Sequence, residues 1–445
     1  MEVIVLAGGL GTRLHGVLAD CPKCLAPVAF PDNLFRKGKK EGRCLSETDY
    51  PEDKKEGRCL PEPNSLDSKK EGRCLPETDS FEGAKPFLWY LLQWLGRYPV
   101  EHVVFSVGYL KEQVIDYVSG REWPFRFDFA EEETPLGTGG GIRLALSRCE
   151  SDKVVVVNGD TFYPVNLCAL PFAGPVTVAL KPMRDFDRYG AVELAPGGIV
   201  RAFHEKTPCA EGLINGGIYA IDRSLLDLSG APERFSFEKE VLETGAGKGR
   251  IYGWVSDASF IDIGVPEDYR KAQWFIPAWN AVQRASEAVL AAQADTLFLD
   301  RDGVLNRHRP GDYVKSTAEW EWMPGIREAL AAWARKFPRI VLVTNQRGVG
   351  KGVMTDRDLA LVHEQMLRDI EESGGRIDLI LVCTAVDDAD PRRKPNTGMF
   401  EEACALLPGI EASRSVMLGD TQTDARFATR CGMPFILLGG ASSGS

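Results

Sequence analysis

The sequence predicts an α/β protein of two domains, each built on a mostly parallel sheet flanked by helices. Short runs rich in Val, Ile and Leu alternate with longer stretches of helical character along the whole chain. These runs are continuously apolar, as expected of parallel strands that are buried on both faces. The chain has 445 residues, which is more than one hydrophobic core usually serves.

Strand candidates occur in both halves of the chain, which predicts one sheet per half. The predicted domains are residues 1–270 and 295–438, followed by a tail at 439–445. Between them lies the Ala-rich stretch Lys271–Asp295, and we expect a packed helical linker over 271–294. The strand candidates are Val3–Ala7, His102–Val107, Val154–Val157 and Val176–Lys181 in the first half, and Thr296–Leu299, Ile340–Thr344, Leu379–Cys383 and Ser415–Leu418 in the second.

The composition is that of a globular protein, with 44% hydrophobic and 26% charged residues. The net charge of −11 argues against a general nucleic-acid-binding protein, but not against phosphorylated substrates, which need only a local basic cluster. No run approaches the roughly 20 apolar residues of a membrane-spanning helix, so no membrane association is expected. The 11 cysteines, and an N-terminus that reaches Gly8 too soon for a signal peptide, predict reduced thiols and a cytoplasmic location.

A charged heptapeptide, KKEGRCL, occurs three times, at Lys39–Leu45, Lys54–Leu60 and Lys69–Leu75. The copies are spaced more closely than the repeats of a solenoid. The surrounding segment, about 31–83, is polar and carries several prolines, so its composition cannot support a core. We interpret it as a duplicated surface insertion that is dispensable for chemistry. A metal trap built from the repeat cysteines is the alternative, but no His accompanies them.

The first strand candidate runs into a glycine-rich turn, AGGLGTRL, that we interpret as a phosphate-binding loop. The backbone N–H groups of Gly8, Gly9, Gly11 and Thr12 can approach phosphate oxygens closely, and the start of a following helix adds a favourable dipole. Arg13 adds a positive charge where pyrophosphate would leave. The pattern matches neither the dinucleotide-binding motif nor the P-loop.

With Lys23 shortly downstream, this turn opens a series of motifs that resembles the sugar-1-phosphate nucleotidyltransferase family over about residues 1–270. The resemblance implies a Rossmann-like domain of the GT-A type, in which a sugar phosphate attacks the α-phosphorus of a nucleoside triphosphate and pyrophosphate leaves. The predicted insertion interrupts the family pattern between Pro27 and Lys85. The matching blocks are Lys85–Leu88, Glu133–Gly140, Asn158–Asp160, Phe203–Lys206, Asn215–Gly217 and Phe260–Gly264.

Asp160 and Asp262 are the predicted metal pair of this half. Asp160 follows a buried strand, Asp262 has a similar strand-end context, and carboxylate oxygens suit Mg²⁺. The resemblance further implies that Lys23 contacts the triphosphate and Lys206 holds the sugar phosphate. It also implies a base and ribose site at Gly137, Thr138 and Gly139, and contacts to sugar hydroxyls from Glu205, Asn215 and Gly216.

In the second half, a strand candidate ends at two acids, Asp300 and Asp302. Two carboxylates this close are costly to bury unless they are used. The first can attack phosphorus to form an aspartyl-phosphate, and the second can protonate the leaving oxygen and then activate water. We therefore expect a phosphatase site here.

Further blocks follow in order, and together they resemble the haloacid dehalogenase (HAD) superfamily over about residues 295–438. Thr344 and Asn345 end a strand, and Thr344 offers a hydroxyl to a phosphate oxygen. Lys394 supplies a cation beside the nucleophile. Asp420 and Asp424 follow the last apolar strand and offer two acids for Mg²⁺. The predicted metal ligands of this half are Asp300, Asp302 and Asp420.

Within this superfamily, the stretches Pro310–Val314 and Asn345–Gly352 resemble the heptose bisphosphate and histidinol phosphate phosphatases. Both subgroups often carry a zinc loop of Cys and His residues. The corresponding stretch Cys383–Lys394 offers one Cys and no His, and zinc needs three or four such ligands. We therefore expect Mg²⁺ in both halves and no zinc.

The first half looks most like D-glycero-D-manno-heptose 1-phosphate guanylyltransferases, and the second like the matching 1,7-bisphosphate 7-phosphatases. The resemblance implies one bifunctional cytoplasmic enzyme that takes a sugar phosphate and a nucleoside triphosphate, most simply GTP, and makes a nucleotide-activated heptose for surface polysaccharide such as lipopolysaccharide. A homo-oligomer is left open. Two alternatives also stay open: a hexose or N-acetylmuramate 1-phosphate uridylyltransferase fused to a histidinol-phosphatase-like enzyme, and a sugar-nucleotide sensor with one degenerate half.

Overall fold

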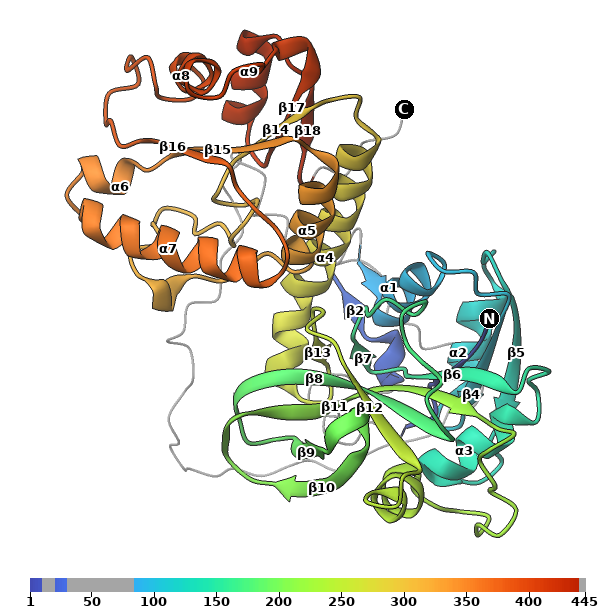
Figure 1. Cartoon of the computed structure of the whole chain (residues 1–445). Coiled ribbons are helices and arrows are strands. Elements are labelled where there is room, and N and C mark those ends of the chain that lie inside the picture. Colours follow the sequence, from blue (N-terminus) through green and yellow to red (C-terminus); the bar gives the residue numbers. More distant parts are fainter. Residues whose placement is uncertain (10–20, 30–83, 440–445) are drawn as a thin grey trace, which may run out of the picture.

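The computed structural model describes residues 1–9, 21–29 and 84–439. Figure 1 shows two lobes, coloured blue to green and orange to red, with the long helix α4 (Pro266–Ala291) running between them. Each lobe holds a sheet with helices packed against it, which confirms the predicted α/β fold class. The heptapeptide copies and the end of the predicted tail lie outside the described residues.

The sheet of the first lobe has nine strands. Its parallel part runs in the order β6-β1-β4-β5, in which β6, β1 (Glu2–Leu6) and β4 are the continuously apolar runs and β5 is a half-exposed edge strand. An antiparallel part around β11 (Cys209–Asp222) extends the sheet beyond β6. The other strands are β4 (His102–Val107), β5 (Arg126–Glu131), β6 (Lys153–Asn158), β8 (Val176–Phe186), β9 (Gly190–Leu194), β10 (Val200–Lys206) and β12 (Ile251–Val255).

Two short antiparallel ribbons lie beside this sheet, and one of them matters for the site. It pairs β7 (Thr161–Phe162) with β13 (Ile261–Asp262), and so brings the end of the lobe's sequence back beside the end of β6. The remaining elements are β2 (Pro27–Val28), β3 (Lys85–Pro86), α1 (Phe87–Leu95), α2 (Lys111–Ser119), α3 (Gly137–Leu146), the short 3-10 helices Lys23–Leu25 and Pro196–Gly198, and a π-helix at Glu238–Glu243.

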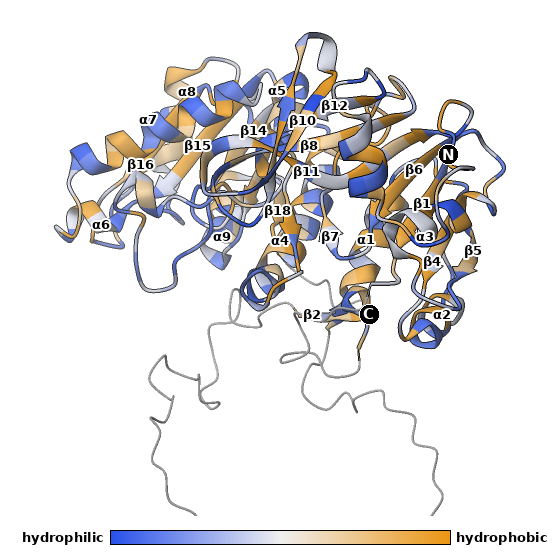
Figure 2. Ribbon diagram, turned by 90° about the horizontal axis from the view of Figure 1, so that it is seen from below, coloured by the Kyte–Doolittle hydropathy of each residue, from blue (hydrophilic) through white to orange (hydrophobic). Residues whose placement is uncertain are grey.

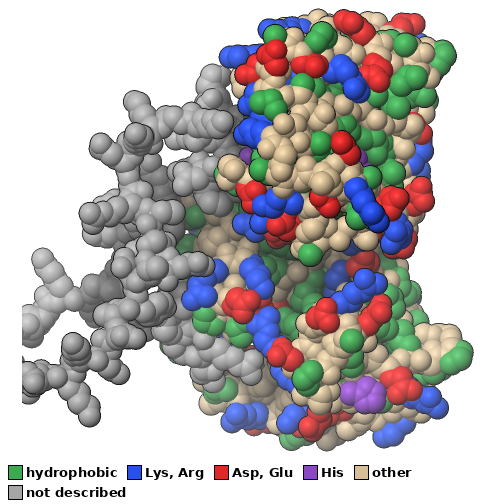
Figure 3. All heavy atoms as spheres, turned by 90° about the vertical axis from the view of Figure 1, so that its left-hand side faces the viewer, with side chains coloured by type: hydrophobic (Ala, Val, Ile, Leu, Met, Phe, Trp, Pro, Cys, Tyr) green, Lys and Arg blue, Asp and Glu red, His purple; other side chains and the backbone are tan. Residues whose placement is uncertain are grey.

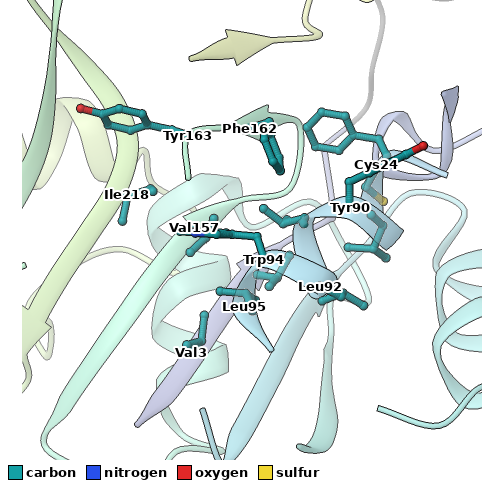
Figure 4. Close-up of a cluster of buried hydrophobic side chains, with 14 of the residues drawn as sticks. Val3, Cys24, Tyr90, Leu92, Trp94, Leu95, Val157, Phe162, Tyr163 and Ile218 are labelled. Atoms are coloured by element: carbon teal, nitrogen blue, oxygen red, sulfur yellow. The ribbon is translucent and has the colours of Figure 1, made fainter. Parts of the chain in front are cut away.

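Helix α1 buries most of its length against this sheet. Seven of its nine residues are buried, among them Trp94 and Leu95. Figure 4 shows these side chains directed toward Val3, Val157 and Phe162, which come from the sheet and the β7 ribbon. The burial of such apolar surface stabilises the fold by about 25 cal/mol per Å², so this core holds the ribbon against the sheet.

The sheet of the second lobe has five strands in the order β16-β15-β14-β17-β18, and every pair is parallel. Parallel strands require crossover connections, so helices cover both faces and all the carboxyl ends lie at one edge. The elements are β14 (Thr296–Leu299), α5 (Ile326–Lys336), β15 (Arg339–Asn345), α6 (Arg347–Gly350), α7 (Asp356–Glu372), β16 (Leu379–Cys383), α8 (Gly398–Leu406), β17 (Ser415–Gly419), α9 (Gln422–Cys431), β18 (Phe435–Leu437), and 3-10 helices at Thr317–Glu319 and Ala412–Arg414.

Helix α4 belongs to both cores. One stripe of its residues lies in the first core: Tyr269, Ala272, Ile276 and Trp279. A second stripe lies in the core of the other lobe: Trp274, Ala278, Val282, Ala285 and Val289. Each stripe follows the three-to-four-residue spacing of one helix face. The two lobes are thus joined by a helix that is packed on both of them.

The outer surface is mixed in character. Figure 2 shows hydrophobic residues concentrated on the central strands and both kinds of residue on helices such as α7. On the face seen in Figure 3, basic and acidic side chains are interspersed. Within the described ranges, no helix combines the length and the apolar character needed to cross a membrane.

Candidate active sites

The first candidate site is a cavity of about 370 Å³ at the carboxyl ends of the parallel strands of the first lobe. Ligands of open α/β sheets bind at this edge. Of the predicted phosphate loop, Gly8 and Gly9 line the cavity, whereas Gly11, Thr12 and Arg13 lie outside the described residues. The predicted residues Lys23, Gly137, Thr138 and Asp160 also line it.

Asp160 and Asp262 face each other across the β7–β13 ribbon. Asp262 pairs with Thr161, the residue after Asp160. Burial and then the charge of Asp160 raise the pKa of Asp262 to about 6. Lys23 Nζ donates to Asp160 Oδ2 at 3.1 Å. Two carboxylates whose repulsion is only partly offset by Lys23 are a donor set that fits a divalent cation.

The glycines of the predicted base site are required by close packing. Gly137 has φ +74°, and a Cβ atom on Gly139 would lie 2.2 Å from the Phe235 ring. The Thr138 hydroxyl donates to Glu238 Oε2 at 2.6 Å and accepts from the backbone N–H of Phe237 at 2.9 Å. The segment containing Phe235 and Glu238 therefore forms one wall of the cavity, together with the start of α3.

Glu132 is a cavity residue to which the sequence motifs assign no role. It follows β5, accepts from the backbone N–H of Leu136 at 2.9 Å, and lies within 3.4 Å of the Ser106 hydroxyl. Burial raises its pKa. Both Glu132 and Ser106 line the cavity. Their position at the ends of adjacent parallel strands is the signal that could have identified them.

The predicted sugar-contacting residues are arranged less compactly. Asn215 and Gly216 lie at an irregularity of β11, where a Cβ atom on Gly216 would lie 2.4 Å from the Tyr163 ring. The Asn215 side chain donates to the Tyr219 hydroxyl at 3.0 Å. Glu205 and Lys206 end β10 and are exposed, and they do not line the 370 Å³ cavity. The structure thus brings Asp160, of the predicted metal pair, together with Gly137 and Thr138 of the predicted base site, but not Lys206, the predicted sugar-phosphate lysine.

The second candidate site is a cavity of about 190 Å³ at the carboxyl edge of the five-stranded sheet. Lys394 is buried and its Nζ lies 2.9 Å from Asp300 Oδ1 and 2.6 Å from Asp424 Oδ1. Burial raises the pKa of Asp300 to about 7, and the charges of Asp424 and Asp302 contribute. Burial, Asp300 and Asp424 likewise raise the pKa of Asp420. One ammonium group does not balance this many buried acids.

This arrangement fits a divalent cation. Oxygen atoms of Asp300, Asp420 and Asp424 lie within 4.8 Å of one another. Asp420 Oδ1 is buried without a hydrogen-bond partner. Gly303, with φ +87°, permits the close approach, since a Cβ atom there would lie 2.0 Å from Asp420 Oδ2. The predicted ligands Asp300 and Asp420 are therefore together, with Asp424 as the third acid.

The carboxylate of Asp302 is turned elsewhere. Its Oδ1 accepts from Arg301 Nη2 and from Asn306 Nδ2, both at 3.0 Å, and its Oδ2 accepts from Gln346 Nε2 at 2.7 Å. Burial opposes ionisation, but Arg301 and these hydrogen bonds outweigh it and lower the pKa of Asp302. Asp302 lines the cavity, so its carboxyl is placed for proton transfer. Both of its oxygens also accept hydrogen bonds from protein groups.

The strand-end residues Thr344 and Asn345 have different surroundings. Asn345 lines the cavity, and its side chain binds the backbone N–H and carbonyl of Lys394, each at 3.0 Å. Thr344 is buried, and its hydroxyl accepts from Gln346 Nε2 at 2.8 Å. Asn345 therefore positions Lys394, whereas Thr344 supports Gln346.

The loop between β16 and Lys394 is held by ion pairs. Asp388 Oδ1 accepts from Arg347 Nη2 at 2.6 Å and from Arg393 Nε at 2.9 Å. Cys383 Sγ lies 3.8 Å from Asp390 Oδ1. The Asp388 ion pair with Arg347 ties the loop to α6.

Comparisons with known proteins match the two lobes to two different families. The nucleotidyl transferase family model matches residues 81–278, and the HAD-hydrolase-like model matches residues 391–444. The D-glycero-alpha-D-manno-heptose 1-phosphate guanylyltransferase of Aneurinibacillus thermoaerophilus is 34% identical over 278 residues, which cover 61% of this chain and 97% of the relative.

The second part of the chain has a different relative. The D-glycero-alpha-D-manno-heptose-1,7-bisphosphate 7-phosphatase of Mycobacterium tuberculosis is 38% identical over 159 residues, which cover 33% of this chain and 81% of the relative. Among solved structures, HddC from Yersinia pseudotuberculosis complexed with GMP-PN is 28% identical and matches 61% of this chain and 97% of its own, with a TM-score of 0.45.

Proposed function

The chain belongs to the nucleotidyl transferase family in its first part and to the HAD-hydrolase-like family in its second, and on that premise we propose one bifunctional enzyme of nucleotide-activated heptose synthesis. The phosphatase lobe removes the 7-phosphate of D-glycero-D-manno-heptose 1,7-bisphosphate. The transferase lobe then joins the remaining heptose 1-phosphate to GMP from GTP. The observation that supports this most is that each lobe gathers acids and a lysine in a cavity at the carboxyl edge of its sheet.

In the phosphatase lobe, an Asp300 oxygen attacks the phosphorus of the 7-phosphate, and the ester oxygen leaves with a proton from Asp302. Asp302 then takes a proton from the water that opens the aspartyl-phosphate. Lys394 reduces the charge repulsion between Asp300 and the incoming phosphate. A Mg²⁺ ion held by Asp300, Asp420 and Asp424 would supply further positive charge.

In the transferase lobe, an oxygen of heptose 1-phosphate attacks the α-phosphorus of GTP, and the bond to pyrophosphate breaks. The protein positions the reactants and neutralises charge, since no covalent intermediate is required. Lys23 and the backbone of Gly8 and Gly9 line the cavity where the triphosphate would bind. Asp160 and Asp262 would hold a Mg²⁺ ion that neutralises the phosphate charge.

Glu132 supports guanine as the base. Guanine presents two adjacent N–H donors on its pairing edge, and an ionised carboxylate is an acceptor only. Glu132→Gln replaces one acceptor oxygen by a donor. We expect the ratio of kcat/KM for GTP over UTP to fall about tenfold or more, while the exposed control Glu133→Gln keeps the wild-type ratio. An unchanged ratio in Glu132→Gln would place base recognition elsewhere.

A single reaction tests the whole proposal. The protein is incubated with heptose 1,7-bisphosphate, Mg²⁺ and each nucleoside triphosphate in turn, and the products are identified by mass spectrometry. We expect inorganic phosphate, pyrophosphate and a GDP-heptose with GTP. Sugar nucleotide formed from UTP alone would favour the uridylyltransferase alternative, and loss of either activity would favour a degenerate half.

A further inference from the structure

Arg301 lies between the two reacting acids Asp300 and Asp302 in the sequence, and the proposed reaction assigns it no role. Its side chain is 0% exposed. A buried guanidinium costs free energy unless its charge is paired and its N–H groups are bonded. Its presence beside the phosphatase cavity, between the two acids in the sequence, therefore needs a reason beyond packing.

The guanidinium is held from three sides. Nη2 donates to Asp302 Oδ1 at 3.0 Å, and Nη1 lies 3.3 Å from His363 Nε2 on α7. Its centre lies 5.9 Å from the centroid of the Trp320 ring. Arginine presents its donors in a planar fork, so contacts at both ends fix its orientation.

His363 supports this orientation as a neutral acceptor. Burial and the positive charge of Arg301 lower the pKa of His363 to about 4, against a small opposing effect of Asp302. At neutral pH its Nε2 can therefore accept from Arg301 Nη1. The positive charge of Arg301 faces Asp302, whose carboxyl is ionised in the resting site and takes up a proton before it acts as the acid.

We propose that Arg301, supported by His363, is a positioning residue that keeps the carboxyl of Asp302 directed at the leaving oxygen of the phosphate ester. This inference rests on the proposed phosphatase function. In the step concerned, a bond forms between an Asp300 oxygen and phosphorus, the ester P–O bond breaks, and the proton of the Asp302 carboxyl moves to the departing oxygen. Asn306 and Gln346 bond to Asp302 as well, but neither carries a charge.

A series of leaving groups tests this role. Dinitrophenolate departs without a proton, whereas phenolate and an alkoxide need one. In Arg301→Met, we expect kcat/KM to fall about 100-fold or more for benzyl and phenyl phosphate, the range that general acid catalysis contributes, and only a few-fold for dinitrophenyl phosphate. The kcat/KM value is the right quantity because it includes only the steps up to departure of the first leaving group.

Variants of His363 provide the matched pair and protect against a folding defect. His363→Phe removes the acceptor and should show the same selective loss, smaller in size, whereas His363→Gln retains an acceptor and should stay near wild type. The exposed Arg357→Met on the same helix is a control for removing an arginine. Transferase activity of the same molecules reports that the chain is folded.

An equal loss for all leaving groups in both Arg301→Met and His363→Phe would make the pair merely structural and overturn the inference, as would no loss in either. These substrates do not include heptose, so failure of the proposed heptose substrate leaves the inference intact. Absence of any phosphatase activity in the wild-type protein would instead refute the proposed function and the inference with it.

Discussion

At the scale of single residues, both sites concentrate negative charge that the protein itself does not neutralise. In the transferase site, the pair is Asp160 and Asp262, and Lys23, which donates to Asp160, offsets only part of their repulsion. In the phosphatase site, Asp300 and Asp420 both have raised pKa values despite Lys394. Such arrangements are unfavourable in the metal-free protein and become favourable when a cation binds.

Asp262→Asn should therefore stabilise the metal-free protein in a pH-dependent way. Because the pKa of Asp262 is raised to about 6 from 3.8 in the folded state, its ionised form is disfavoured by folding, and the unfolding free energy falls as pH rises through this range. We expect the variant to gain on the order of 1–3 kcal/mol at pH about 8 and almost nothing at pH about 4.

Thermal melts in a chelator at both pH values measure this gain. Asp116 is exposed, so Asp116→Asn serves as the control and should change the unfolding free energy only slightly at either pH. A gain in Asp262→Asn that is the same at both pH values would show that its charge is already neutralised. The same variant should lose most transferase activity, because half of the proposed metal pair is gone.

At the scale of elements, helix α4 connects the two lobes and packs in the core of each. Its two apolar stripes lie in different cores, so the helix cannot separate from either lobe without exposing the core of that lobe. Its ends contact β2 of the first lobe and β17 and β18 of the second. The stability of each lobe therefore depends on a segment that the sequence presents as a connection.

Ile276→Ala should lower the stability of the first lobe. Ile276 is 0% exposed in the first core, and truncation of such a side chain costs about 2–5 kcal/mol because a cavity remains. Leu290→Ala, on an exposed position of the same helix, should cost far less. Urea unfolding followed by transferase and phosphatase activity separates the two lobes, and an equal loss of both would show that they unfold as one unit.

The loop before Lys394 is a second element-scale case. Asp388, paired with Arg347 and Arg393, connects the loop to α6 where a cysteine–histidine zinc loop would need metal. We expect metal analysis of the purified protein to find no stoichiometric zinc and Cys383→Ser to retain phosphatase activity. Stoichiometric zinc that is lost in Cys383→Ser would contradict this expectation.

At the scale of the whole molecule, the two lobes meet at the segment that leads to Asp262. Arg327 of α5 donates to Asp257 Oδ2 at 2.8 Å, and Lys181 of β8 donates to the Asp257 backbone carbonyl at 3.0 Å. The backbone N–H of Gly325 donates to Ser259 Oγ at 2.9 Å. The phosphatase lobe thus supports a segment of the transferase site.

Arg327→Ala should accordingly affect transfer more than phosphate release. The ion pair with Asp257 is partly exposed, and such pairs contribute at most about 1 kcal/mol, so we expect no more than a fivefold rise in the Mg²⁺ concentration for half-maximal transfer. Phosphatase kinetics should stay at the wild-type level. Arg335→Ala, at the other end of α5, is the control. A change in phosphatase activity of Arg327→Ala would place the contact in the other site.

The chemical steps themselves should be separable. Asp300→Asn preserves shape and removes the attacking charge, so phosphate release from the bisphosphate should fall by orders of magnitude. Transfer of GMP onto supplied heptose 1-phosphate should be almost unchanged, because no group in the transferase cavity contacts Asp300. Collapse of transfer onto the monophosphate as well would mean that the two sites are coupled.

The fold and much of both sites could be predicted from the sequence because the relevant information is local. Continuous apolar runs predicted strands that the structure shows as β1, β4, β6, β8, β14, β15, β16 and β17. Acids and glycines directly after such runs indicated the reacting groups. The strands β5, β9 and β10 were missed because they are half-buried or exposed and lack this continuous apolar signal, and β11 was missed although its second half is buried.

What the sequence by itself determined is the chemistry available in each half: two phosphate-handling sites, their acids and their lysines. Only the tertiary structure decided which groups meet. It joined Asp424 to Asp300 and Asp420, turned Asp302 toward Arg301, and placed Glu132 in the nucleotide cavity. The reason is physical: residue types and strand ends follow from neighbours along the chain, whereas the direction of a buried side chain follows from charges and hydrogen bonds supplied by distant segments.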